Sequence, residues 1–238
     1  MLTGARSRSV DRNLLGDQVY ELLKSEILTG DLRPRERVTV AGLATRFGLS
    51  PTPVRDALRR LSTDGLVKLL PRRGTVVTAF DQKSVREVFQ IRRIIECAAV
   101  EAVPRAPRAT LSRMRELVLA MEDLRAGETF ADYPEFIVLD AEFHRCMIEL
   151  LDSSRLVQFY ETLRWPILVI RGLSQSPFQR ANATVAEHRR IADACRRRDV
   201  QSARGAVLDH LRNAEADLIR RVPGEVGDAA RPASRRSP

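Results

Sequence analysis

The sequence lacks the features that mark membrane, secreted and disulfide-rich proteins. No run of apolar residues approaches the roughly 20 residues that a membrane-spanning helix needs. The basic N-terminal residues 1–13 have no apolar run behind them, so we expect no secretion signal. The only cysteines, Cys97, Cys146 and Cys195, stand apart without a C-x-x-C pair. Their odd number argues against a disulfide framework and favours a cytoplasmic protein with reduced thiols, mostly in the core.

Positive charge, by contrast, is in excess, and it is unevenly distributed. Lys and Arg outnumber Asp and Glu by 40 to 31, which gives a net charge of +9 over 238 residues. Residues 1–80 hold 14 basic and 8 acidic side chains, whereas residues 81–238 hold 26 and 23. A basic module of this kind can release counterions from a phosphate backbone, which suggests nucleic-acid binding. Many basic proteins bind no DNA, so charge alone does not decide the function.

The first third of the chain has the pattern of three helices followed by a β-hairpin. Helical spacing, glycine stops and turn signals set the expected boundaries. The expected helices cover residues 14–30, 40–47 and 51–63, and the two expected strands cover 66–70 and 75–78, with a short extended piece at 37–39. Gly48 ends the second helix, and Ser50 is expected to cap the third, which begins at Pro51.

The third expected helix has one apolar and one polar face. The apolar stripe comprises Val54, Ala57, Leu58 and Leu61, and the polar stripe comprises Thr52, Arg55, Asp56 and Arg59. A helix supported by two others can enter the major groove, where Thr52, Arg55 and Arg59 would reach base edges or phosphates. Arg72 and Arg73, at the hairpin tip, would reach phosphates or the minor groove. The alternative is a small α+β unit with a solvated charged face.

Four segments of this region carry a family resemblance. They are ILTGDL at 27–32, LATRFGLSPTPVRDALRRL at 43–61, DGLV at 64–67 and PRRG at 71–74. Together they closely resemble the winged helix-turn-helix of the GntR family of bacterial regulators, over about residues 17–80. The resemblance implies that the DNA contacts come from Arg46, Ser50, Thr52, Arg55, Arg59, Arg72, Arg73 and Gly74.

Two positions depart from the GntR pattern. Pro51 stands where the family usually has an arginine that contacts DNA, and Arg35 replaces the usual glycine after Pro34. The first departure puts any transfer of a family operator sequence in doubt, and Arg55 remains the best-supported DNA contact.

From Gln82 onward the sequence predicts helix after helix and no strands. The expected helices are 82–103, 110–126, 133–151, 154–173, 179–198 and 200–221. Pro166 should kink the fourth helix, Gly127 should close the second, and Asp199 should cap the last. We therefore expect an all-α bundle of about six helices behind the winged helix. The expected domains are an arm at 1–13, a DNA-binding domain at 14–80, the bundle at 81–221 and a disordered tail at 222–238.

All three histidines fall in the expected bundle, each on an apolar stripe. Asp140 lies one turn before His144, so the two side chains can hold one metal ion from a single helix. His188 and His210 could complete the ligand set from two other helices. Imidazole and carboxylate ligands suit divalent Zn, Ni, Mn or Fe and leave positions open. The alternative is that these are hydrogen-bonded core histidines.

The bundle also resembles a known domain. LDAEFH at 139–144, EHRRI at 187–191, and DHL at 209–211 with Ala203 before it resemble the FCD ligand-binding domain of FadR-type GntR regulators. The resemblance implies that Asp140 and the three histidines bind a metal, and that a small carboxylate effector completes the coordination. The family's R-x-x-x-E falls on Arg92 and Glu96. Arg92 is expected to face the effector, with a surface ion pair to Glu96 as the alternative, and Asn213 is a second expected effector contact.

These observations predict a transcriptional repressor controlled by a small organic acid. The resemblance implies a homodimer, which would suit a palindromic double-stranded DNA operator. One alternative is a metal-responsive regulator without an organic effector. The other is a metal-dependent enzyme fused to a DNA-binding head, which would need a general base or nucleophile beside the metal. No Ser-His or Glu-x-x-His constellation provides one, so the sequence does not favour an enzyme.

Overall fold

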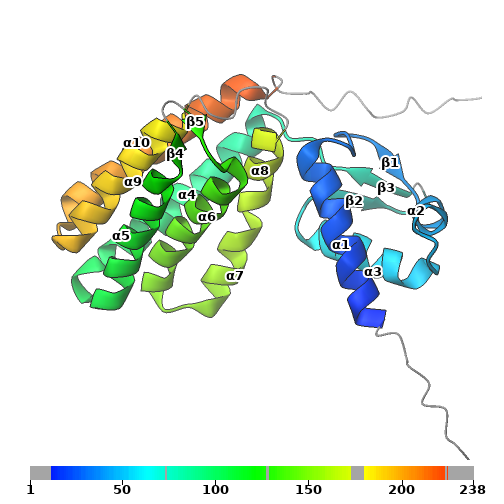
Figure 1. The fold of residues 1–238 in the computed structure, drawn as a ribbon, viewed down its shortest axis with the longest axis horizontal. Helices are drawn as coiled ribbons and strands as arrows, with labels where there is room; N and C mark the ends of the chain where they lie inside the picture. The colour runs from blue at the N-terminus through cyan, green and yellow to red at the C-terminus, as the bar shows by residue number, and fades with distance from the viewer. Residues whose placement is uncertain (1–11, 73, 127–128, 173–179, 223, 225–238) are drawn as a thin grey trace, which may run out of the picture. The chain divides into compact units, whose positions relative to one another are not determined.

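The computed structural model describes residues 12–72, 74–126, 129–172, 180–222 and 224 (Figure 1). The chain divides into two compact units between Ala79 and Phe80, one residue before the expected boundary. Arg73, Gly127 and nearly all of the expected arm and tail lie outside the described residues. The arm is nevertheless shorter than expected, because the first helix already begins at Arg12.

The N-terminal unit is a helix-turn-helix with a small antiparallel sheet, as the sequence predicts. Its helices are α1 (Arg12–Thr29), α2 (Val40–Phe47) and α3 (Pro51–Thr63), and its strands are β1 (Arg37–Val38), β2 (Val67–Leu70) and β3 (Gly74–Val77). The strands pair in the order β1-β3-β2, and α3 packs against α1, α2 and β2. The apolar stripe of α3 is buried, whereas Thr52, Arg55 and Arg59 are exposed. This confirms the two predicted faces of α3.

The start of α3 differs from the expectation in one respect. Ser50 occupies the N-cap position, but its side chain makes no capping hydrogen bond. A capping hydroxyl accepts from the N–H of the second or third helical residue. The third residue here is Pro53, which has no N–H, so one of the two usual donors is missing.

The C-terminal unit is a helical bundle. Its long helices are α4 (Gln82–Glu101), α5 (Arg108–Asp123), α6 (Tyr133–Ile148), α9 (Ala181–Arg196) and α10 (Val200–Arg221), and its short ones are η1 (Val103–Arg105), η2 (Glu149–Leu151), α7 (Ser154–Thr162) and α8 (Arg164–Gly172). Helix α10 packs along α4 and α9, and α5 packs along α6 and α9 (Figure 1). Cys146 and Cys195 are buried in the core and Cys97 is partly buried, all three as free thiols. No helix of the described residues is long and apolar enough to cross a membrane.

Two details of the bundle correct the sequence prediction. The expected helix 154–173 is two helices, α7 and α8, broken at Leu163. Pro166 lacks the N–H that would bond to the carbonyl of Thr162, and its ring excludes that carbonyl, so the helix breaks here. The expected helix to residue 126 ends at Asp123, and a short hairpin of β4 (Arg125–Ala126) and β5 (Thr129–Phe130) follows. The prediction of no strands was wrong because two-residue strands have no alternation to recognise.

Candidate functional site

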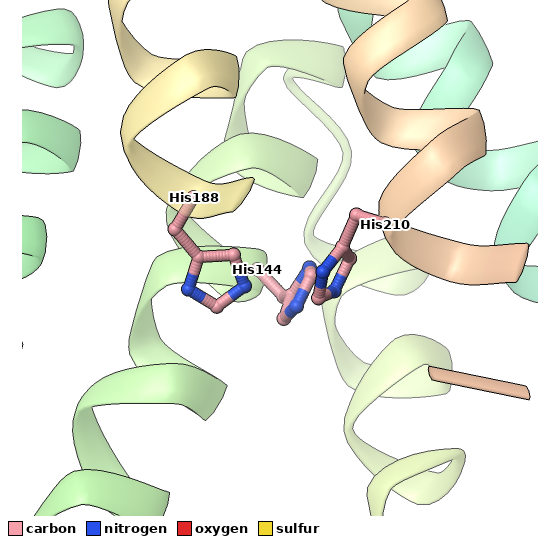
Figure 2. Close-up of side chains that lie close together, drawn as sticks. All are labelled: His144, His188 and His210. Atoms are coloured by element: carbon pink, nitrogen blue, oxygen red, sulfur yellow. The ribbon is translucent and has the colours of Figure 1, made fainter. Parts of the chain in front are cut away.

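Three histidines from three helices meet in the core of the bundle. His144 comes from α6, His188 from α9 and His210 from α10, and Figure 2 shows their rings close together. One ligand nitrogen of each lies within 4.8 Å of those of the other two. All three side chains are buried, and Phe143 stacks on His188 with ring centroids 4.3 Å apart. The sequence prediction that the three histidines come together is therefore correct.

The level of His188 and His210 follows from the hairpin that joins their helices. Asp199 caps α10 by accepting from the backbone N–H of Ser202, and α9 ends just before it. His188 lies eleven residues before Asp199 and His210 eleven residues after it. At 1.5 Å per residue, His188 lies about 12 Å from the end of α9 and His210 about 15 Å from the start of α10. These similar distances on the two sides of one turn bring the two imidazoles close together, with ring centroids 4.7 Å apart.

Carboxylates orient two of the three imidazoles. Nδ1 of His144 lies 3.1 Å from Oε2 of Glu96, and Nδ1 of His210 lies 2.8 Å from Oε2 of Glu187. A carboxylate can only accept, so each Nδ1 carries the proton and each Nε2 keeps a lone pair. This arrangement, a carboxylate behind a histidine, is typical of histidines that bind metal ions.

Glu187 is itself held in place from two sides. Arg180 donates to both of its carboxylate oxygens, and Asn213 donates from its side-chain amide to Oε1 at 2.8 Å. Asn213 is exposed and does not line the pocket described below. Asn213 thus contacts Glu187, the residue that orients His210. Its expected contact with an effector stays a prediction.

His188 is the imidazole without a fixed partner. Among the described residues, neither of its ring nitrogens has a hydrogen-bond partner, although the side chain is fully buried. Oδ1 of Asp140 lies 3.7 Å from its Nε2, too far for a hydrogen bond. Burying two unsatisfied nitrogens is costly. A cation beside Asp140 would use the lone pair of one of these nitrogens, so His188 fits the expected metal ion.

The surroundings of His188 and His210 favour their neutral forms. Burial above all, with the positive charge of Arg92, lowers the pKa of His188 well below its usual value. Burial also lowers the pKa of His210 to about 4, although its hydrogen bond to Glu187 acts in the opposite direction. A metal ion binds the neutral imidazole. At neutral pH, His188 and His210 therefore already have the protonation state that metal binding needs.

A buried ion pair adjoins the histidines. Arg92 and Glu96 lie on α4 at 6% and 0% exposure, and Nε of Arg92 lies 2.7 Å from Oε1 of Glu96. The hydroxyl of Tyr160 donates to the same Oε1 at 2.5 Å. Pairing with Arg92 and His144 outweighs burial and holds the pKa of Glu96 below its ordinary range. The alternative of a surface ion pair between Arg92 and Glu96 was wrong, because this pair is in the core.

A pocket opens beside the cluster. It encloses about 450 Å³ of empty space, part of it open to solvent. Its lining includes Arg92, Asp140, His144, Tyr160 and Arg164. It combines apolar walls with a few convergent polar groups, as small-molecule sites do. Two of the expected metal ligands and the expected effector contact Arg92 therefore face one cavity.

Sequence reasoning missed the roles of Tyr160 and Glu187. Tyr160 contacts a helix more than 60 positions earlier in the chain, and no local pattern indicates this. Glu187 does have a signal, because it directly precedes His188 in the sequence. The sequence does not show, however, that the partner of Glu187 is His210 on the neighbouring helix and not the adjacent His188.

The expected DNA contacts lie in three places on the N-terminal unit. Arg55 is exposed on α3, with no ion-pair partner among the described residues. Arg59 is also exposed and lies 3.7 Å from Asp56, and Ser50 and Thr52 are exposed where the helix begins. Arg46 is held by Glu26, which accepts from both of its terminal nitrogens.

Of the wing residues, Arg72 lies in the turn between β2 and β3, and Gly74 is the first residue of β3. Arg72 is exposed with a φ of 60°, and Gly74 has a φ of 83°. A Cβ on Gly74 would lie 3.1 Å from the carbonyl oxygen of Val38, so this position favours glycine for both its conformation and its space.

Each of the two units matches a known protein family. Residues 15–77 match the model of bacterial regulatory proteins of the gntR family, and residues 87–213 match the FCD domain. The HTH-type transcriptional regulator YdhC of Bacillus subtilis (strain 168) is 31% identical over 206 residues, which cover 86% of this chain and 91% of YdhC. The HTH-type transcriptional repressor RspR of Escherichia coli (strain K12) is 25% identical, over 90% of this chain and 92% of RspR.

A solved structure shares the fold. The structure of a GntR transcriptional regulator from Rhodococcus sp. RHA1 aligns with a TM-score of 0.69 at 24% identity. The alignment covers 86% of this chain and 97% of that one.

Proposed function

Because the chain belongs to the GntR family of bacterial transcriptional regulators and carries an FCD domain, we propose that it is a repressor that binds a metal ion and responds to a small organic acid. In this proposal it binds a palindromic operator as a homodimer, and a small carboxylate held at a divalent metal ion in the bundle controls DNA affinity. The repressor assignment is supported by the name of the relative RspR. The observation that carries the proposal is the convergence of three buried histidines beside a pocket.

The metal site would consist of Asp140, His144, His188 and His210. Glu96 and Glu187 fix the tautomers of His144 and His210, and the unsatisfied nitrogens of His188 supply the remaining imidazole donor. A divalent ion of the Zn, Ni, Mn or Fe type would provide open coordination positions that attract an anion. Adding its two positive charges to the negative Asp140 and to the balanced pair Arg92–Glu96 leaves one net positive charge in the site. A monocarboxylate would neutralise it.

The effector would lie in the pocket against Arg92. The guanidinium is fixed by Glu96 and Tyr160, so it costs little entropy to orient toward a carboxylate. Asp140 and His144 line the same pocket, so an acid bound there would lie beside two of the proposed metal ligands. Such an acid can change DNA affinity only if it binds two states of the protein with different affinity.

The operator would be read by α3 and positioned by the wing. Thr52, Arg55 and Arg59 are exposed on one face of α3, as base or phosphate contacts require. Arg46, Ser50, Arg72, Arg73 and Gly74 complete the proposed DNA-contacting set. Pro51 offers no arginine and no N–H at the start of α3, which favours an operator different from the one usual in the family.

The direct test is DNA binding by the intact protein. We expect fluorescence anisotropy with the region upstream of its own gene to show sequence-selective binding that weakens steeply as salt rises. Arg55→Ala should weaken binding about tenfold or more, which is the usual effect of losing a base contact. Arg155→Ala, at an exposed position of α7, serves as the matched control. Binding that is equal for unrelated DNA, or unchanged by Arg55→Ala, would contradict the proposal.

The same assay separates the sensor alternatives. Protein loaded with Zn²⁺ or Mn²⁺ is titrated with a panel of small carboxylates, and at least one is expected to lower operator affinity. A response to the metal alone, with none of the acids adding to it, would favour the metal-responsive regulator instead.

A further inference from the structure

One nitrogen in the histidine cluster already has a partner that competes with a cation. Nη2 of Arg92 lies 3.1 Å from Nε2 of His144. Because Glu96 accepts the proton of Nδ1, Nε2 of His144 accepts from the guanidinium. This lone pair is the one His144 would offer to a metal ion. It cannot serve an arginine N–H and a metal ion at once.

Arg92 is held in this position by contacts at its other nitrogen. Nε donates to Oε1 of Glu96 at 2.7 Å and to the hydroxyl of Tyr160 at 3.1 Å. The guanidinium carbon also lies 5.2 Å from the ring centroid of Phe89. These contacts hold the guanidinium at Nε. Because the group is planar and rigid, leaving His144 requires the whole guanidinium to pivot about Nε. Arg92 also lines the pocket.

From these contacts we propose that Arg92 is a latch that couples the two ligands of the site. Without ligands, Arg92 occupies the lone pair of His144 and weakens metal binding. When a carboxylate enters the pocket, Arg92 donates to it instead and releases His144. Metal and carboxylate then strengthen each other's binding, and by thermodynamic linkage the factor is the same in both directions. This inference rests on the metal site of the proposed function and adds how that site is regulated.

The first test measures the affinity of the purified full-length protein for Co²⁺ by visible absorption. Arg92→Lys keeps the positive charge beside Glu96 but lacks the second arm that reaches His144. We expect this variant to bind Co²⁺ about tenfold more tightly than the wild type, the size of one lost hydrogen bond to a charged group. Arg93→Lys is the matched control, since its ion-pair partner is Glu215 and not a residue of the cluster, and it should bind like the wild type.

The second test uses acetate, a weak chelator. Acetate is expected to tighten Co²⁺ binding by the wild type more than by Arg92→Lys, in which only direct coordination of the metal by acetate remains. Equal Co²⁺ affinity of the wild type and Arg92→Lys overturns the latch while leaving the metal site intact. No effect of acetate on the wild type overturns the coupling. If no variant and no wild-type sample binds Co²⁺, the metal site itself fails, and the proposed function fails with it.

A third measurement needs no variant at Arg92. The chain has three histidines, so ¹⁵N spectra of labelled, metal-free protein can be assigned by comparison with His144→Ala. We expect His144 to be protonated at Nδ1 and to accept a hydrogen bond at Nε2. A proton on Nε2 would overturn the latch, since no lone pair would then face Arg92.

Discussion

Arg35 is a residue whose backbone conformation lowers the stability of the N-terminal unit. It has a φ of 69°, in the left-handed region that favours glycine, and its N–H donates to the carbonyl of Val77 at 2.9 Å. The sequence pattern identified this position as one where related proteins usually have glycine, and the backbone conformation supplies the reason. The hydrogen bond to Val77 needs only the backbone, so the arginine side chain is not what holds this turn.

Arg35→Gly should therefore stabilise the protein. Removing the left-handed strain is expected to raise the free energy of unfolding by about 1 kcal/mol. The measurement is urea unfolding followed by circular dichroism. The control is Arg37→Gly in β1, where the backbone is extended and glycine should be destabilising. Equal effects of the two substitutions would show that the conformation at residue 35 is not strained.

Individual residues also mark the limit of what the sequence predicts about the site. His144, His188 and His210 were found because each lies on an apolar stripe, a local pattern that persists in the fold. Tyr160 was missed because its partner Glu96 is 64 positions away. Arg92 and Glu96 were recognised as a pair, but spacing along one helix cannot distinguish a buried pair from an exposed one.

Where a side chain caps a helix, it fixes the residue at which the helix begins. Asp81 accepts from the backbone N–H of Ser84 at 2.8 Å and so fixes the start of α4, the helix that carries Arg92 and Glu96. The same hydrogen bond lowers the pKa of Asp81 below its ordinary value. The cap therefore stabilises the folded state most when the carboxyl group is ionised.

Asp81→Ala is expected to destabilise the protein by about 1 kcal/mol at pH 7, the usual cost of losing a cap. The folded pKa of Asp81 is depressed, so its stabilisation is present above about pH 3.9 and is lost as pH falls through the lower folded value. Urea unfolding of the wild type and Asp81→Ala at pH 7 and pH 3 should show a smaller difference between their free energies of unfolding at pH 3. Lys83→Ala, exposed in the same first turn, should change little. A difference that does not depend on pH would contradict the ionised cap.

Whole helices were easier to predict than their ends and breaks. The hydrophobic periodicity of α4, α6, α9 and α10 extends over many residues, so the existence and approximate bounds of these four helices could be predicted from the sequence. Ser50 fails as a side-chain cap because Pro53 removes a donor, and the hairpin at 125–130 is too short for a pattern. The fourth predicted helix was expected to kink at Pro166, and the structure breaks it completely.

At the scale of the whole molecule, the chain joins its two units directly. Helix α4 begins five residues after β3 ends, so the helix that carries Arg92 is also the one covalently closest to the wing. In the proposed function, a change at the pocket must alter what the N-terminal unit does with DNA. The two activities should therefore be separable by substitutions confined to one unit.

His188→Ala tests this separation. We expect its bound metal, measured by elemental analysis after loading, to fall to a small fraction of the wild-type content. The response of DNA affinity to carboxylates should be blunted, while operator affinity in their absence should be retained. His188→Gln, closer in volume to histidine, checks that any loss does not come from a cavity in the core. Unchanged metal content in both variants would count against His188 as a ligand.

The hairpin of α9 and α10 makes the site depend on chain length more than on the identity of its surface residues. An insertion of one residue between His188 and Asp199 would rotate His188 by about 100° around its helix and shift it by about 1.5 Å along the axis. The imidazole would then face away from His210 even though every residue of the site was still present. An insertion or deletion in either helix between its histidine and the turn would therefore disrupt the site, whereas the exposed positions of both helices can vary in sequence.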